Sequence, residues 1–162
     1  MADLLSKMPT TYEPKRKNRW LFRFPAELGI QEFWLVSAAR PTITQNETEI
    51  QLLNTSTWVI GRFTWEPIDV TLRDGIGPST AQAVMEWVRL HSESATGRQG
   101  YAAGYKKDVE IEMLDPNGVV VEKWVLQGTM ITKANFGDLS MDDDSLADVQ
   151  ISLRFDRALL IF

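Results

Sequence analysis

The only histidine in the chain is His91, so any histidine-dependent chemistry rests on this one residue. A catalytic triad also needs a nucleophile on a sharp turn, but the sequence has no GxSxG motif and no cysteine. A metal site with several His or Cys ligands is excluded by the same composition. His91 falls on or beside the apolar stripe of an expected helix, so we expect a packed side chain and no catalytic residue.

Two groups of carboxylates are the remaining candidates for chemistry. Asp142, Asp143 and Asp144 offer oxygen ligands to a hard cation, but consecutive residues point in different directions and the spacing does not fit an EF-hand. Asp108, Glu110 and Glu112 alternate along one stretch, a pattern shared by a paired-carboxylate hydrolase and by a plain polar sheet face. The sequence has neither GxxxxGK[ST] nor a strand–turn–helix GxGxxG. We expect no metal and no cofactor, and a solvated loop at 142–144.

The stretch from Tyr105 to Thr132 is predicted to be the hairpin that organises the fold. Within 108–113, apolar residues alternate with the three acidic residues, which is the period of a strand with two different faces. Asp115-Pro116-Asn117-Gly118 then predicts a tight turn, because proline presets φ and glycine accepts a positive φ. Residues 119–126 are β-branched and aromatic, as expected for the return strand, and Gly128 predicts a bend or bulge in it.

Shorter strands are expected on both sides of this hairpin. They are Arg19–Phe24, Gln31–Arg40, Glu49–Leu53, Trp58–Arg73 with a break at Pro67, and Asp148–Phe155. The first two are expected to pair with each other, so that 19–40 forms a second hairpin.

One convincing helix is expected, at about residues 79–94. Ser79 with Gln82 fits a capping box, and Trp87 lies on the apolar stripe. About seven strands and one helix predict a mainly β protein, an antiparallel β-sandwich or partly closed barrel with one flanking α-helix.

Charge divides the 162 residues into an arm and a body. Residues 1–23 hold six Lys or Arg against two acidic residues, whereas the other 139 hold 11 against 20. We expect an irregular basic N-terminal arm at 1–18 and a single β-sandwich domain at 19–162, with the arm either solvated or in contact with an acidic neighbour. The acidic body argues against sequence-specific nucleic-acid binding. No apolar run fits a signal peptide or a membrane span, so an intracellular origin is the expectation.

Two further stretches suit contact with another chain. Residues 42–57 form a polar excursion that is long for a plain connection, and are expected to be either an arm or an ordinary surface loop. Residues 158–162 are all apolar, and are expected either to tuck into the core or to dock on a partner.

With these features in place, the sequence resembles the tail tube proteins of contractile-tailed bacteriophages over roughly residues 18–162. The stretches that carry the resemblance are NRWLFRF…QEFWLVSAARP, FTWEPIDVTLRD, STAQAVMEWV with its tryptophan, GYAAGYKKDVEIEML, and the ending WVLQGTMITKANFGDLSMDDDSLADVQISLRFD. The N-terminus departs from the family, because it is longer and more basic.

The resemblance implies a subunit of hexameric rings that stack into a hollow tube inside a contractile sheath. The implied location is the virion tail, after synthesis in the bacterial cytoplasm, and the implied partners are sheath, baseplate or tube initiator, and tape measure protein. DNA would pass through without specific binding, along a lumen whose candidate lining is Asp108, Glu110 and Glu112. Tubes of type VI secretion systems and contractile bacteriocins share the fold and stay open as alternatives, as does a tube initiator.

The resemblance also marks the arm, the polar excursion and the apolar end as contacts between subunits. The candidate residues are Lys15, Arg16, Lys17, Glu47, Glu49, Leu52, Leu159, Leu160, Ile161 and Phe162. Two other classes stay open: a small-ligand-binding β-barrel lined by tryptophans, and a paired-carboxylate hydrolase.

Overall fold

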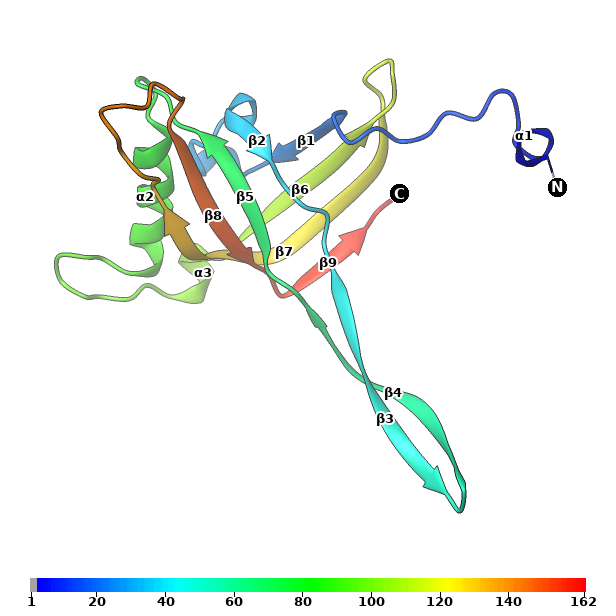
Figure 1. Ribbon diagram of the computed structural model, residues 1–162. Helices are drawn as coiled ribbons and strands as arrows, with labels where there is room; N and C mark the ends of the chain where they lie inside the picture. The colour runs from blue at the N-terminus through cyan, green and yellow to red at the C-terminus, as the bar shows by residue number, and fades with distance from the viewer. Residues whose placement is uncertain (1–2) are drawn as a thin grey trace.

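The computed structural model describes residues 3–162, and its longest strand is β7, Val120–Asn135 (Figure 1). It pairs with β6, Lys107–Leu114, as the predicted central hairpin. The Asp115 carboxylate closes the turn by accepting hydrogen bonds from the backbone N–H groups of Asn117 (2.8 Å) and Val119 (2.7 Å). Gly118 has a φ of 84°, which a residue with a Cβ adopts only at a cost.

The other strands complete an antiparallel architecture around β7. They are β1 (Trp20–Arg23), β2 (Leu35–Ser37), β3 (Ile43–Leu52), β4 (Thr55–Trp65), β5 (Ile68–Arg73), β8 (Asp148–Arg154) and β9 (Arg157–Leu160). Over the described residues, a seven-stranded sheet runs β1-β6-β7-β8-β5-β2, with β9 also paired to β7, and β3-β4 form a separate two-stranded ribbon.

Gly128 divides β7 into two halves with different partners. The N-terminal half pairs with β6 and β9, and the C-terminal half pairs with β8. Lys107 lies opposite Thr129 while Val109 lies opposite Leu126, so β7 holds one extra residue there. Gly128 has a φ of 68°, which confirms the predicted bulge. The bulge lets a single strand serve both parts of the sheet.

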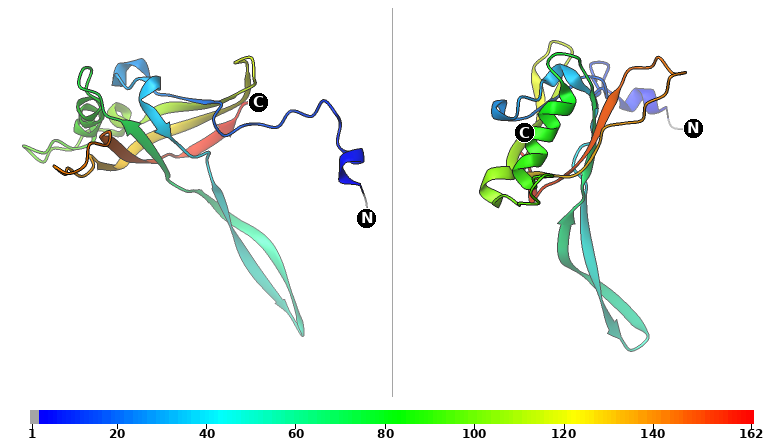
Figure 2. Two further views of the ribbon diagram at one scale, coloured as in Figure 1. Left: turned by 45° about the horizontal axis from the view of Figure 1, so that its top comes forward. Right: turned by 90° about the vertical axis from the view of Figure 1, so that its left-hand side faces the viewer.

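The helix α2, Thr80–His91, lies against one side of this body (Figure 2). Its N-cap is Ser79, whose hydroxyl accepts a hydrogen bond from the Gln82 N–H at 3.4 Å, as the capping box predicts. Trp87 is fully buried, and its indole N–H donates to the Tyr105 carbonyl at 2.9 Å. The shorter helical pieces are α1 (Leu4–Lys7), η1 (Ala26–Leu28), η2 (Glu32–Trp34) and α3 (Ala102–Tyr105).

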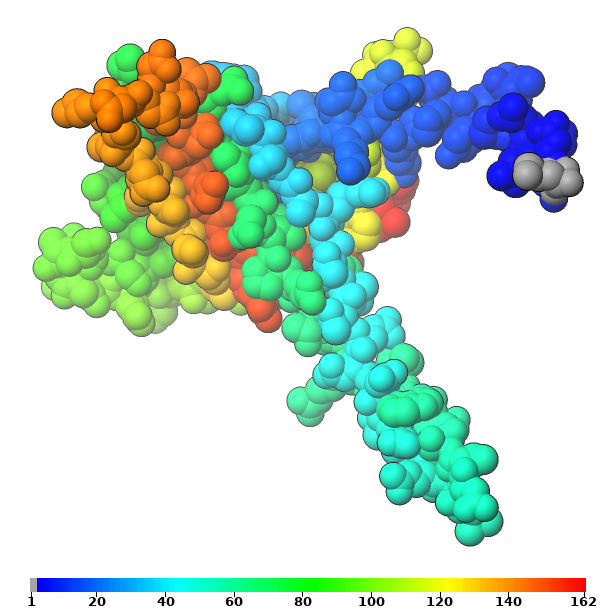
Figure 3. All heavy atoms as spheres, viewed as in Figure 1, coloured from blue at the N-terminus to red at the C-terminus, as the bar shows by residue number. Residues whose placement is uncertain are grey.

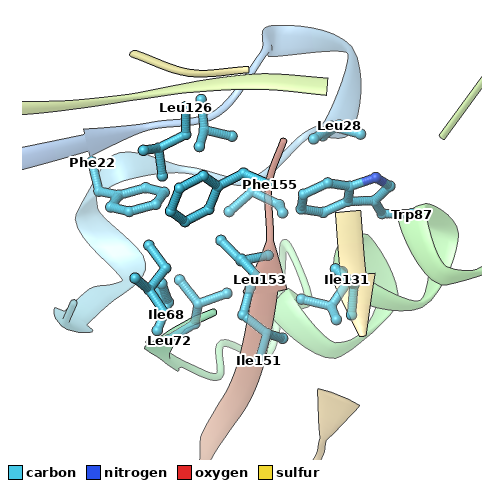
Figure 4. Packing of buried hydrophobic residues seen from close by; sticks show 14 of the residues in the cluster. Phe22, Leu28, Ile68, Leu72, Trp87, Leu126, Ile131, Ile151, Leu153 and Phe155 are labelled. Atoms are coloured by element: carbon cyan, nitrogen blue, oxygen red, sulfur yellow. The ribbon is translucent and has the colours of Figure 1, made fainter. Parts of the chain in front are cut away.

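The core lies between α2 and the inward faces of the strands (Figure 4). Its buried members include Phe22, Leu72, Trp87, Leu126, Ile151, Leu153 and Phe155. Apart from Trp87 of α2 and Phe155 just after β8, they come from alternate positions of β1, β5, β7 and β8, which is why the period-two pattern was informative. The predicted class, mainly β and antiparallel with a flanking helix, is confirmed, and the sheet does not close into a barrel.

Three predictions about strands are wrong in detail. Residues 19–40 do not form a hairpin, because β1 pairs with β6 and β2 pairs with β5. The predicted strand at 31–40 shrinks to Leu35–Ser37, preceded by η2. Residues 42–57 are not a connection with one short strand at 49–53, since β3 already covers Ile43–Leu52 and pairs with β4, which begins at Thr55. The division into an arm at 1–18 and one domain at 19–162 stays a prediction.

Candidate assembly surfaces

The β3-β4 ribbon projects from the body as a free-standing hairpin (Figure 3). Every residue of β3 is exposed, and so is every residue of β4 except Trp65. The ribbon is anchored at its base, where the Trp65 ring packs against Trp124 and Phe155 at centroid distances of 6.5 and 6.1 Å. Its predicted contact residues Glu47, Glu49 and Leu52 are all exposed.

The register of the ribbon separates its side chains into two faces. Glu49 lies opposite Trp58 and Ile50 lies opposite Thr57, and side chains of opposed residues share a face. One face, which we call the threonine-rich face, has no acidic residue; it carries Thr44, Asn46, Thr48, Ile50, Leu52, Thr55, Thr57, Val59 and Thr64, with Arg62 at the register shift near the base. The other carries Glu47 and Glu49 beside exposed Trp58, Ile60 and Phe63.

The tip of the ribbon holds a leucine in an unusual conformation. Leu53 is fully exposed and has a φ of 37°, and it is the only non-glycine with a positive φ in residues 3–162. Two-residue hairpin turns with positive φ favour Asn or Gly, whereas leucine pays a steric cost. An exposed apolar side chain is thus held at a position where neither solvent nor the backbone favours it.

The predicted acidic face of β6 is only partly open to solvent. Asp108 is exposed and accepts a hydrogen bond from the Gly128 N–H at 3.1 Å, and Glu110 pairs with Lys123 at 3.3 Å. Glu112 is buried, at 3% exposure, between Arg23 (3.4 Å) and Lys123 (3.8 Å). Glu112, named with Asp108 and Glu110 as a candidate lumen residue, is therefore not a surface anion of this subunit, because cations of β1 and β7 enclose it. Which face lines a lumen stays a prediction.

Of the predicted arm contacts, Lys15 already has a partner within its own chain. It pairs with Glu122 of β7, and Arg40 approaches the same carboxylate at 3.3 Å. The Trp124 indole N–H also donates to Glu122 at 2.6 Å. Burial opposes ionisation of Glu122, but the three donors together hold its pKa below the ordinary value. Sequence reasoning missed this cluster, which joins segments far apart in the chain.

Arg16 and Lys17 are exposed, and neither forms an ion pair within residues 3–162. They therefore remain available to a partner, as does α1 with its exposed Leu4 and Leu5. Whether they contact another subunit is untested and stays a prediction.

The apolar C-terminal residues form an unpredicted edge strand. Backbone hydrogen bonds tie β9 and the residues after it to β7, including Ile161 N–H to the Lys123 carbonyl at 2.8 Å. Ala158 is buried, whereas Leu159 is 38% exposed and Leu160, Ile161 and Phe162 are more than half exposed. The segment thus tucks in at one residue and leaves four apolar side chains on the surface.

His91 is held by backbone groups on both ring nitrogens. Its Nε2 accepts from the Ile131 N–H at 3.1 Å, so its Nδ1 carries the proton and donates to the Trp87 carbonyl at 2.8 Å. The ring stacks on Tyr105 with centroids 4.6 Å apart. Burial lowers the pKa of His91 and outweighs the Trp87 hydrogen bond, which raises it.

Within residues 3–162 no group of three or more His, Asp or Glu side chains is placed to hold a metal ion. The aspartates at 142–144 lie exposed in the loop between β7 and β8. In the same described part of the chain, none of the helices has the length and apolar character to span a membrane.

Comparison with known proteins gives matches in structure alone: no family model and no curated protein sequence matches the chain. A chain in the cryo-EM structure of the PVC extracellular contractile injection system sheath/tube terminator matches with a TM-score of 0.75 at 15% identity, covering 94% of this chain and 100% of that one. A chain of the anti-feeding prophage tube terminating cap matches at 0.73 and 17%, covering 98% of both.

This protein has the contractile-tube fold. A more distant match is Hcp1 of Flavobacterium johnsoniae, at a TM-score of 0.55 and 7% identity, covering 88% of this chain and 94% of that one. The fold expected from the resemblance to tail tube proteins is thereby confirmed. The exposed β3-β4 ribbon, the basic arm and the β9 edge remain candidate contact surfaces of this fold.

Proposed function

We propose that this chain is a structural subunit of a contractile-system tube. It assembles with copies of itself into rings, hexameric as in the family it resembles, and the rings stack into a hollow conduit inside a sheath and above a baseplate. A phage tail that conducts DNA is the form favoured by the sequence, and a bacteriocin or secretion tube has the same architecture. The fold shared with contractile injection systems supports this proposal.

The observation that carries the proposal is the β3-β4 ribbon. A two-stranded hairpin with no third strand or helix against it is only marginally stable in water. Here some twenty residues project with large apolar side chains exposed on both faces. A neighbouring subunit that covers the threonine-rich face supplies the missing layer, and Leu53 at the tip gives that contact an apolar end.

The open edges of the sheet also support assembly. Beyond the ribbon, β1 and β2 end the sheet path and β9 has one free side. A chain that stays alone must protect such edges, whereas a ring of copies covers them by heterologous contacts that close.

A structural role rather than a catalytic one follows from how the candidate groups are used. Glu110 and Glu112 are matched by Lys123 and Arg23, and both nitrogens of His91 are taken by the backbone. Asp108 and Glu110 are our candidates for a lumen lining, where negative charge repels a DNA backbone and prevents it from sticking.

Negative-stain electron microscopy of the purified protein, beside sedimentation velocity over a concentration series, tests the proposal. Rings or hollow tubes are the expected result, and their symmetry gives the copy number. Added sheath or baseplate proteins should nucleate tubes if the chain alone waits for an initiator. If the chain stays monomeric with and without such partners and gains stability from a small apolar ligand, the tube proposal fails. The alternative function, binding of a small ligand, would then be favoured.

A further inference from the structure

A pocket with an apolar floor and a cationic rim opens where the N-terminal arm meets the sheet. We call it the arm-base pocket, and it has a volume of about 310 Å³. Its main lining residues are Lys17, Trp20, Ala39, Arg40, Ile111 and Met113. Ile111 and Met113 are buried at 3% and 8% exposure and form the floor, whereas Lys17 and Arg40 are exposed at the rim.

This combination selects the kind of group that the pocket can hold. The floor favours one or two aliphatic side chains, because burying them removes apolar surface from water on both sides. The rim favours carboxylates beside those side chains, since Lys17 has no ion-pair partner within residues 3–162 and Arg40 shares Glu122 with Lys15. The matching ligand is a segment in which acidic residues flank exposed aliphatic ones.

The chain itself contains such a segment, the loop between β7 and β8. We call residues 136–147 the acidic loop; it holds Asp138, Asp142, Asp143 and Asp144 and no Lys or Arg. Leu139 and Met141 lie between the aspartates and are fully or almost fully exposed, at 95% and 106%. Aliphatic side chains this exposed next to four anions indicate a surface made for a partner.

The loop and the pocket lie far apart on the subunit. In Figure 1 the acidic loop, in orange, lies at one end of the body, while the basic arm leaves from the other end. Figure 3 shows the same separation, with the body between the two segments. A contact between loop and pocket therefore joins two different copies of the chain.

We propose that the acidic loop of one subunit docks into the arm-base pocket of the next. Leu139 and Met141 cover the apolar floor, and the aspartates at 142–144 face Lys17 and Arg40. The contact is heterologous, because each subunit gives a loop on one side and a pocket on the other, and such a contact closes into a ring when the rotation permits. This inference rests on the proposed self-assembly and names one interface within it.

Cysteine cross-linking tests the contact directly, because the natural chain has no cysteine. A variant with Leu139→Cys and Ala39→Cys in the full-length protein should, after addition of an oxidant, give a ladder of covalent oligomers on denaturing gels. The matched control pairs Ala39→Cys with Glu86→Cys on the exposed side of α2, and should stay a covalent monomer.

Mixing two one-sided variants tests the polarity of the contact. Leu139→Asp with Met141→Asp spoils only the loop, and Ala39→Trp fills only the pocket. Each variant alone should lose ring assembly in sedimentation, with an unchanged thermal unfolding midpoint. A mixture should form pairs and stop there, since only one intact loop and one intact pocket remain.

The outcomes separate this inference from the proposed function. If wild-type rings or tubes form and the Leu139–Ala39 pair gives no covalent ladder, the loop-to-pocket contact is wrong while the tube proposal stands. If the one-sided variants assemble like wild type, the contact is also wrong. If the wild-type chain forms no assembly with its partners, the tube proposal fails, and a ladder that still appears in concentrated protein would show the contact without the tube.

Discussion

Lys15 in the arm and Glu122 in β7 form an ion pair across 107 positions of sequence. The carboxylate is 8% exposed, while the lysine and the second cation, Arg40, are each about half exposed. The pair therefore fixes the root of the arm to the sheet next to the arm-base pocket, whose rim includes Lys17 and Arg40. Lys15, which the sequence predicted to contact a neighbouring subunit, therefore holds the arm of its own subunit against the sheet.

Glu122→Gln should weaken the fold by about 1–3 kcal/mol at neutral pH, the usual range for hydrogen bonds to a buried charged group. The donors hold the folded-state pKa of Glu122 below its unfolded value of about 4.3, so its contribution is complete above that pH and is lost as the pH falls through the folded pKa. Urea unfolding of both proteins from pH 7 to pH 3 measures this. A stability difference that stays constant over the range would contradict it.

The single histidine should titrate below its ordinary pKa of about 6.5. Protonation of Nε2 removes the acceptor for the Ile131 N–H, so the folded state favours the neutral ring. Stability from His91 is complete above the unfolded pKa and is lost as the pH falls toward the lower folded pKa. Proton NMR of the imidazole gives the pKa without resonance assignment, because the chain has one histidine. A pKa at or above about 6.5 would contradict this account.

Gly128→Ala should cost about 1–3 kcal/mol, because alanine disfavours a positive φ and its Cβ would meet the Asp156 carboxylate. Gly104→Ala is the matched control, since its Cβ has nothing within 4 Å and the residue lies in α3. Chemical unfolding compares the two. Equal effects of both substitutions would mean that the bulge is not needed to bend β7.

Leu53→Asn should leave the fold intact and weaken assembly. Asparagine tolerates positive φ, so the turn loses its steric cost while the ribbon loses its apolar tip. Thermal unfolding and sedimentation measure the two effects separately. Wild-type assembly by this variant would remove the tip from the proposed interface.

Leu159→Glu with Leu160→Glu should give a folded chain that does not assemble, since both side chains reach the surface of the edge strand. Val119→Lys, an equally exposed apolar position at the β6-β7 turn, serves as the charge control. Rings from the double variant seen by electron microscopy would exclude the apolar end from the contacts.

Where one face of a strand is buried, the sequence predicted the structure well. The alternation in β6 and β8, the turn at Asp115–Gly118, the Ser79 cap and the bulge at Gly128 all follow from local rules. Pairing partners do not, because alternation reports which side of a strand is buried and not which strand lies beside it. This is why β1 and β2 were wrongly joined into a hairpin.

The candidate surfaces were harder to predict for a related reason. The ribbon has no buried face, so its strands lack the alternation that reveals a core strand. Glu112 follows the acidic alternation of β6, yet Arg23 and Lys123 from neighbouring strands enclose it. Both outcomes depend on contacts between distant segments, which a local pattern does not contain.

The ribbon also determines how the subunit would respond to a pull. β4 runs into β5 with only Glu66 and Pro67 between them, and Figure 1 shows the ribbon leaving the body along the general direction of β5. Tension on the tip would therefore act lengthwise on β5, in shear against the six residue pairs that join it to β8. Shear loads all pairs together, whereas peeling breaks them one at a time. In the proposed tube, sudden contraction of the surrounding sheath would therefore load the sheet along the direction in which it resists force best.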